Sequence, residues 1–64
     1  MAKTFFVYQN SVSEKLYKSG LTEREADKAY NELDKLVKNG LGGGVACIGS
    51  IEDDWCVAKR LGIV

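Results

Sequence analysis

The stretch from Leu21 to Gly40 specifies one amphipathic helix, and this helix constrains the fold more than any other feature. Thr22 and Glu25 form a T-x-x-E capping box at its start. Asn39-Gly40 supplies a left-handed exit at its end. Between these signals, apolar residues recur at spacings of three and four and form one stripe: Ala26, Ala29, Tyr30, Leu33, Leu36 and Val37. The helix carries no reactive group, and we interpret it as a scaffold.

Short segments on either side of this helix have the composition of strands. Residues 4–8, 45–48 and 55–60 are rich in aromatic, β-branched or small apolar residues, and each is too short for a core helix. Residues 12–19 are open to two interpretations. As a helix they would begin at a second capping box, Ser11 and Glu14, and stop at Gly20. We favour a strand, because the aromatic strand before it needs a partner and eight residues make a marginal helix.

The order is therefore strand, strand, helix, strand, strand over one domain, residues 1–64. This order predicts an α+β fold in which one helix packs across a small antiparallel sheet. One helix covers only one face of a sheet. In the first strand Phe5 and Val7 point one way while Phe6 and Tyr8 point the other. We expect the uncovered face to present aromatic surface suited to an interaction. The alternative is that chain ends and long side chains cover it.

Size and charge restrict the function classes. A chain of 64 residues buries a small core, so disulfides, a metal or a partner usually add stability. Two cysteines allow at most one internal bridge, and the chain has no histidine. Nine basic and nine acidic residues cancel, which argues against a dedicated nucleic-acid binder. With no membrane-length apolar run and no signal-peptide pattern, we expect a cytoplasmic protein.

Cys47 and Cys56 are the first candidates for chemistry. If residues 45–60 form a hairpin, the two side chains are opposed or diagonal on one face and could form a disulfide in an oxidising setting. We favour two small buried thiols in a reducing cytosol. A zinc site of four cysteines shared across a dimer is a remote alternative.

Two other segments have a functional and a structural interpretation. Glycines 42–44 could cradle an anion, but a phosphate-binding loop opens a helix, whereas this run follows one, so we favour a permissive turn. Glu52-Asp53-Asp54 lacks calcium-loop spacing and is typical of a solvated turn. The functional alternative is an electrostatic docking element, with Trp55 beside it as an aromatic anchor.

Catalysis has little support in this sequence. Without histidine, proton transfer would fall to carboxylates, lysine, tyrosine or cysteine, and no spacing forces a pair of them together. A core this small also makes a deep pocket hard to build. We predict that the protein is not an enzyme and that it uses no cofactor and no metal.

Residues 19–49, from Ser-Gly-Leu-Thr-Glu-Arg-Glu-Ala to Cys-Ile-Gly, resemble the start of HU-type DNA-bending proteins. There a helix precedes Ser-Gly-Leu-Thr/Ser, and a long amphipathic helix, a glycine and a strand follow. The resemblance implies a helix over residues 12–19. The basic arm and its proline have no counterpart here, so DNA bending is not implied.

In size, neutral charge and lack of catalytic groups, the chain also resembles small phage-encoded proteins that bind and block a host enzyme or defence complex, such as anti-CRISPR proteins. This resemblance rests on architecture and implies an inhibitor with a protein target.

We therefore predict a non-enzymatic protein-binding module, an inhibitor or modulator that occupies the surface of a larger protein. The expected contact residues are Tyr8, Tyr17, Asp53, Asp54 and Trp55. One alternative is a small nucleic-acid binder whose lysines flank stacking aromatics on the sheet, as single-strand binders do: Lys3, Lys15 and Lys18 beside Phe6, Tyr8 and Tyr17. Another is a structural homodimer in which exposed sheet faces meet.

Overall fold

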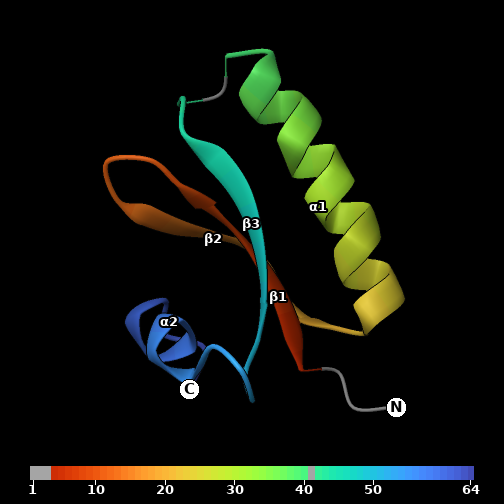
Figure 1. The fold of residues 1–64 in the computed structure, drawn as a ribbon, viewed down its shortest axis with the longest axis vertical. Helices are drawn as coiled ribbons and strands as arrows, with labels where there is room; N and C mark the ends of the chain where they lie inside the picture. Colours follow the sequence, from red (N-terminus) through yellow and green to blue (C-terminus); the bar gives the residue numbers. More distant parts are fainter. Residues whose placement is uncertain (1–3, 41) are drawn as a thin grey trace.

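The computed structural model describes residues 4–40 and 42–64. Three strands and two helices follow one another in the order β1 (Phe5–Asn10), β2 (Glu14–Leu21), α1 (Glu23–Lys38), β3 (Val45–Ser50) and α2 (Trp55–Arg60) (Figure 1). The strands form one antiparallel sheet in the order β2-β1-β3. The predicted α+β fold, a small antiparallel sheet with a helix packed across it, is confirmed.

Helix α1 has the start and the end that the sequence predicts. The Glu25 amide donates to the Thr22 hydroxyl at 3.2 Å, and the Thr22 amide donates to the Glu25 carboxylate at 2.9 Å. At the other end Gly40 has φ +100°, a conformation that glycine adopts without steric cost. Most of the apolar stripe packs on the sheet, where Ala26, Ala29 and Leu33 form one buried cluster with Val7 and Ala46. This cluster is the main core. Leu36, which was predicted as part of the stripe, is 41% exposed.

Residues 12–19, for which the sequence allowed either a helix or a strand, lie mostly in a strand. Residues 14–21 form β2, which pairs with β1 and has two irregularities in register near Val7. The helix that HU-type proteins would have at residues 12–19 is therefore not found. The observed strands are longer than predicted or displaced: β1 continues to Asn10, and β2 begins at Glu14.

The last predicted strand is wrong, because residues 55–60 form helix α2. A Schellman motif ends this helix: the Gly62 amide donates to the Lys59 carbonyl at 3.2 Å, and the Ile63 amide to the Ala58 carbonyl at 2.9 Å. Gly62 has the required positive φ, +79°. Trp55, Cys56 and Val57 have strand composition, but a glycine placed just past a short helix favours the helical end.

Helix α2 lies on the opposite side of the sheet from α1 (Figure 1). Phe6 points to that side, since its neighbour Val7 packs under α1, and both Phe6 and Ala58 are fully buried. The expectation of an uncovered aromatic face is therefore wrong in part. The short second helix covers part of that face, beside β3 (Figure 1), and large exposed side chains remain on both edge strands, Leu16 on β2 and Val45 and Ile48 on β3.

Candidate protein interface at the edge of the sheet

Strand β3 is an edge of the sheet, and its register shows which main-chain groups face outward. The Ile51 amide donates to the Thr4 carbonyl at 2.9 Å. Because partners in an antiparallel ladder alternate, Gly49, Cys47 and Val45 direct their N–H and C=O groups to β1. Ala46 and Ile48 direct theirs away from the sheet. No strand of the described residues pairs with them.

The outward groups of Ser50, by contrast, are satisfied locally. The Ser50 amide donates to the Asp54 carboxylate at 3.1 Å, and the Asp54 amide donates to the Ser50 carbonyl at 2.7 Å. The Ser50 hydroxyl in turn accepts a hydrogen bond from the Asp53 amide and donates one to the Asp53 carboxylate. The turn 50–54 therefore closes one end of the edge, and the open part is centred on Ala46 and Ile48.

The two edges of the sheet differ in protection. Soluble proteins usually blunt an edge strand with lysines, proline or bulges, because exposed main-chain groups attract other strands. Strand β2 carries Lys15 and Lys18 and two register irregularities. Strand β3, Val-Ala-Cys-Ile-Gly-Ser, has no charge, no proline and no irregularity. Its Ile48 side chain is 39% exposed and its Val45 side chain 57%. By these criteria β3 is the edge open to strand addition.

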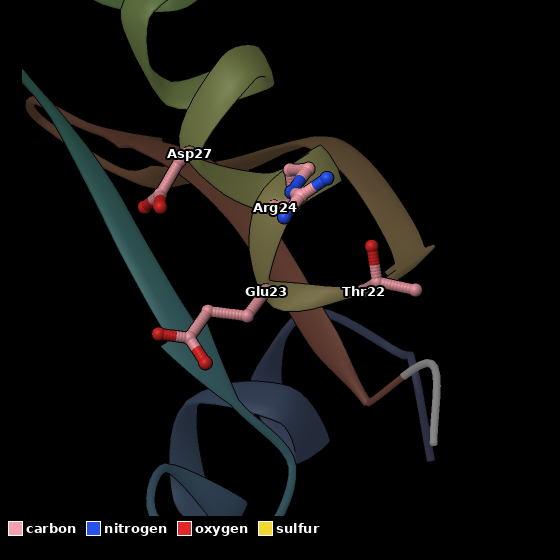
Figure 2. A pocket seen from close by; sticks show the side chains of 4 residues that line it. All are labelled: Thr22, Glu23, Arg24 and Asp27. Carbon is pink, nitrogen blue, oxygen red and sulfur yellow. The ribbon is translucent and has the colours of Figure 1, made fainter. Parts of the chain in front are cut away.

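A groove beside this edge is acidic. Its walls are the second half of β3, the start of α1 and the turn before α2, and four carboxylates line it: Glu23, Asp27, Asp53 and Asp54. Figure 2 shows the Glu23 and Asp27 side chains directed toward β3, while Arg24 points away from it. Among the described residues none of the four carboxylates takes part in a salt bridge. We call this groove and the outward side of β3 the β3 edge surface.

Trp55 stands next to the acidic turn as the first residue of α2, and it is 54% exposed. Large aromatic side chains held half-exposed on a rigid element are common anchors in protein interfaces. The structure thus brings together three of the five predicted contact residues, namely Asp53, Asp54 and Trp55.

Tyr8 and Tyr17 do not join them on one face. Tyr8 lies opposite Leu16 and Cys47 on the α2 side of the sheet, whereas Tyr17 packs against the core under α1. Burial, with a further contribution from the neighbouring Cys47, raises the pKa of Tyr8 above 10. The shared aromatic surface expected from the sequence is therefore not formed.

On the α2 side of the sheet, one salt bridge among the described residues joins two elements that are distant in sequence. Arg60 donates from Nε and Nη2 to both carboxylate oxygens of Glu14, at 2.8 and 3.0 Å. This two-bond geometry holds the pKa of Glu14 below its usual value. It ties the end of α2 to the start of β2.

The basic and aromatic residues of the nucleic-acid alternative are dispersed. Phe6 is fully buried, and Lys18 lies beside Tyr17 on the α1 side, where its ammonium is 3.8 Å from Glu32. Lys3 is outside the described residues. No continuous stacking face connects these groups.

Cys47 and Cys56 are both free thiols, and the helix at 55–60 removes the hairpin that would have opposed them. The expectation that both are buried is wrong, because Cys47 is only half-buried and Cys56, on the short helix, is exposed. The glycine run forms a turn: Gly43 accepts a hydrogen bond from the Gln9 side chain at 2.7 Å, and glycines 42–44 all have positive φ. Leu41, which precedes this glycine run, is outside the described residues.

A shallow depression at the start of α1 is lined by Thr22, Glu23, Arg24 and Asp27 (Figure 2). The Thr22 hydroxyl accepts the hydrogen bond of the capping box from the Glu25 amide. Across residues 4–40 and 42–64 no helix is long and apolar enough to cross a membrane, and no three acidic, cysteine or histidine side chains gather as metal ligands would.

Comparisons with protein families, with characterised proteins and with solved structures found no match to this chain. The function must therefore be argued from the site. Sequence reasoning missed Glu23, Asp27, Ala46 and Ile48, since their role depends on which strand lies at the edge.

Proposed function

We propose that this chain is a non-enzymatic protein-binding module that occupies the surface of a larger protein as an inhibitor or modulator, and that the β3 edge surface is its contact site. The observation that carries the proposal is the position of β3 at the edge of the sheet, where Ala46 and Ile48 direct their main-chain groups away from β1 on a strand without charge. An extended segment of a partner adds to such an edge by main-chain hydrogen bonds.

The charge of the groove indicates the chemistry of the partner segment. Glu23, Asp27, Asp53 and Asp54 form a rim around one end of the edge, and no described cation pairs with them. A basic extended segment would place its ammonium or guanidinium groups against this rim, which favours encounter and fixes the direction of the added strand. Trp55 would add apolar contact at the same end.

A non-enzymatic role is supported by the absence of histidine and by the local engagement of hydroxyl groups. The Thr22 and Ser50 hydroxyls both serve local caps and turns. The acidic side chains of the rim lie at the surface, where they suit recognition of charge better than proton transfer.

The test uses two synthetic peptides of equal length, one alternating lysine with valine and one alternating glutamate with valine. Binding is followed by the fluorescence of Trp55, the single tryptophan. We expect the lysine peptide to bind at least about tenfold more tightly, because several rim contacts of about 0.2–1 kcal/mol each favour it. The preference should weaken as salt concentration rises.

Two matched variants locate the site. Ile48→Lys places a charge on the open edge, while Leu16→Lys places one on the other edge strand at a side chain of similar exposure, 41%. Ile48→Lys should abolish peptide binding and Leu16→Lys should leave it intact. Equal loss in both variants, or equal affinity for the two peptides, would refute the proposal.

A further inference from the structure

We infer that a second copy of this chain pairs with the β3 edge in an antiparallel register centred on Cys47, and so closes the edge to other partners. The inference rests on the proposed function in one respect, since it says how partner binding at the same edge is regulated. The dimer is the closed form, and the monomer is the form that binds.

The register follows from the outward-facing main-chain groups. Hydrogen-bonded pairs between two edges can form only from residues whose N–H and C=O groups point outward, which here are Ala46 and Ile48. Pairing Ala46 of one copy with Ile48 of the other satisfies all of these groups on both strands. A two-fold axis then passes between the two Cys47 residues.

Side chains of the edge permit this pairing. No charge lies on β3, so no like charges meet across the two strands. On the α1 side, the half-exposed Ile48 would lie next to Ala46 of the second copy. On the α2 side, the exposed Val45 would lie opposite Gly49, where the Phe6 ring and the Asp54 carboxylate occupy the place of a side chain.

The charges that flank the edge are complementary in this arrangement. Helix α1 runs antiparallel to β3, because its acidic start lines the groove beside residues 48–50 and its end leads to the turn before Val45. Its last turn carries Lys35 and Lys38. The two-fold axis therefore places the acidic start of one α1 near the basic end of the other, with the helix dipoles opposed.

Cys47 provides a direct test of the register. Residues opposed in a non-hydrogen-bonded antiparallel pair have Cα atoms about 4.5 Å apart, a separation that a disulfide can span. Diamide would remove two electrons and two protons from the two thiols and so link the copies. Cys56 is the more exposed cysteine, so random collisions would link Cys56 in preference.

The experiment compares Cys56→Ser with Cys47→Ser under diamide, alongside light scattering across a dilution series. We expect Cys56→Ser to form at least about tenfold more covalent dimer than Cys47→Ser, because only its remaining cysteine lies on the two-fold axis. Ile48→Lys in the Cys56→Ser background should abolish the crosslink and give a monomer. Val45→Lys serves in its place if that variant does not fold.

A monomer at every concentration, or crosslinking through Cys56 alone, would overturn the inference. The peptide experiment fails or succeeds separately. Peptide binding without a dimer would remove the inference and leave the proposed function standing. If a Cys47-centred dimer forms but the lysine peptide does not bind at any dilution, the proposed function is refuted while the self-pairing is still supported.

Discussion

Replacing Gly49 with alanine should destabilise the fold, because the Phe6 ring and the Asp54 carboxylate leave no room for a side chain there. A Cβ atom built at Gly49 lies 2.9 Å from Cζ of Phe6 and 3.0 Å from the Asp54 carboxylate. The Phe6 ring is fully buried and cannot withdraw, and the Asp54 carboxylate already accepts from the Ser50 amide. An aromatic ring that lies across a strand glycine is a recurrent packing device.

The magnitude follows from opposing contributions. Overpacking a buried site costs about 1–3 kcal/mol, and weakening the Asp54–Ser50 hydrogen bond costs roughly 0.5–1.5 kcal/mol. Burial of one methyl group returns about 0.8 kcal/mol, and the reduced freedom of the unfolded chain returns roughly 0.4–1 kcal/mol. We expect a net loss of about 1.5 kcal/mol, which lowers the melting temperature by roughly 6–12 °C in a domain of this size.

Urea unfolding followed by circular dichroism measures this loss. Phe6→Leu in the same background should relieve the crowding, so the double variant should lose at least about 0.5 kcal/mol less than the sum of the single losses. If Gly49→Ala is neutral or stabilising, or if the two losses simply add, the packing of Phe6 across Gly49 is refuted.

Three further predictions test local features. Thr22→Ala should cost about 1 kcal/mol of stability through loss of the helix cap, whereas Thr22→Ser should cost little, as measured by thermal unfolding. The hydrogen bonds from Arg60 lower the pKa of Glu14, so this pair should stabilise the protein fully at pH values above the unfolded pKa of glutamate. The stabilisation should be lost as the pH falls through the folded pKa, and a titration of stability with acid should not show this loss in Glu14→Gln. Tyr8 should ionise above pH 10 in the folded protein, so its contribution to stability should decline at alkaline pH above that value, and ultraviolet difference titration of wild type against Tyr8→Phe should show the raised midpoint.

The parts of the fold that depend on near neighbours in sequence could be predicted. The capping box of α1 is a contact between Thr22 and Glu25, and its apolar stripe repeats within one turn, so both were visible in the sequence. Helix α2 was missed because Trp55 and Val57 favour a strand by composition. The signal for its end was present at Gly62, whose positive φ forms part of the Schellman motif.

The candidate site depended on contacts between distant residues. The register places Leu16 opposite Tyr8, which sends Tyr17 to the other face; a shift of one residue would have reversed this, and no local signal determines it. Likewise, Glu23 and Asp27 meet the acidic turn only because β3 is the edge strand next to the start of α1. Of the site residues, only Asp53, Asp54 and Trp55 could be placed together from the sequence, because they are consecutive.

Amide hydrogen exchange at Ala46 and Ile48 tests the central claim most directly, because strand addition must protect these two outward amides. The amides of Cys47 and Gly49 bond to β1 and serve as internal references. We predict rapid exchange at Ala46 and Ile48 in dilute protein and marked slowing at high protein concentration or with saturating lysine peptide, while the references change little. If exchange at Ala46 and Ile48 stays unchanged under both conditions, the edge of β3 does not accept a strand and the account is contradicted.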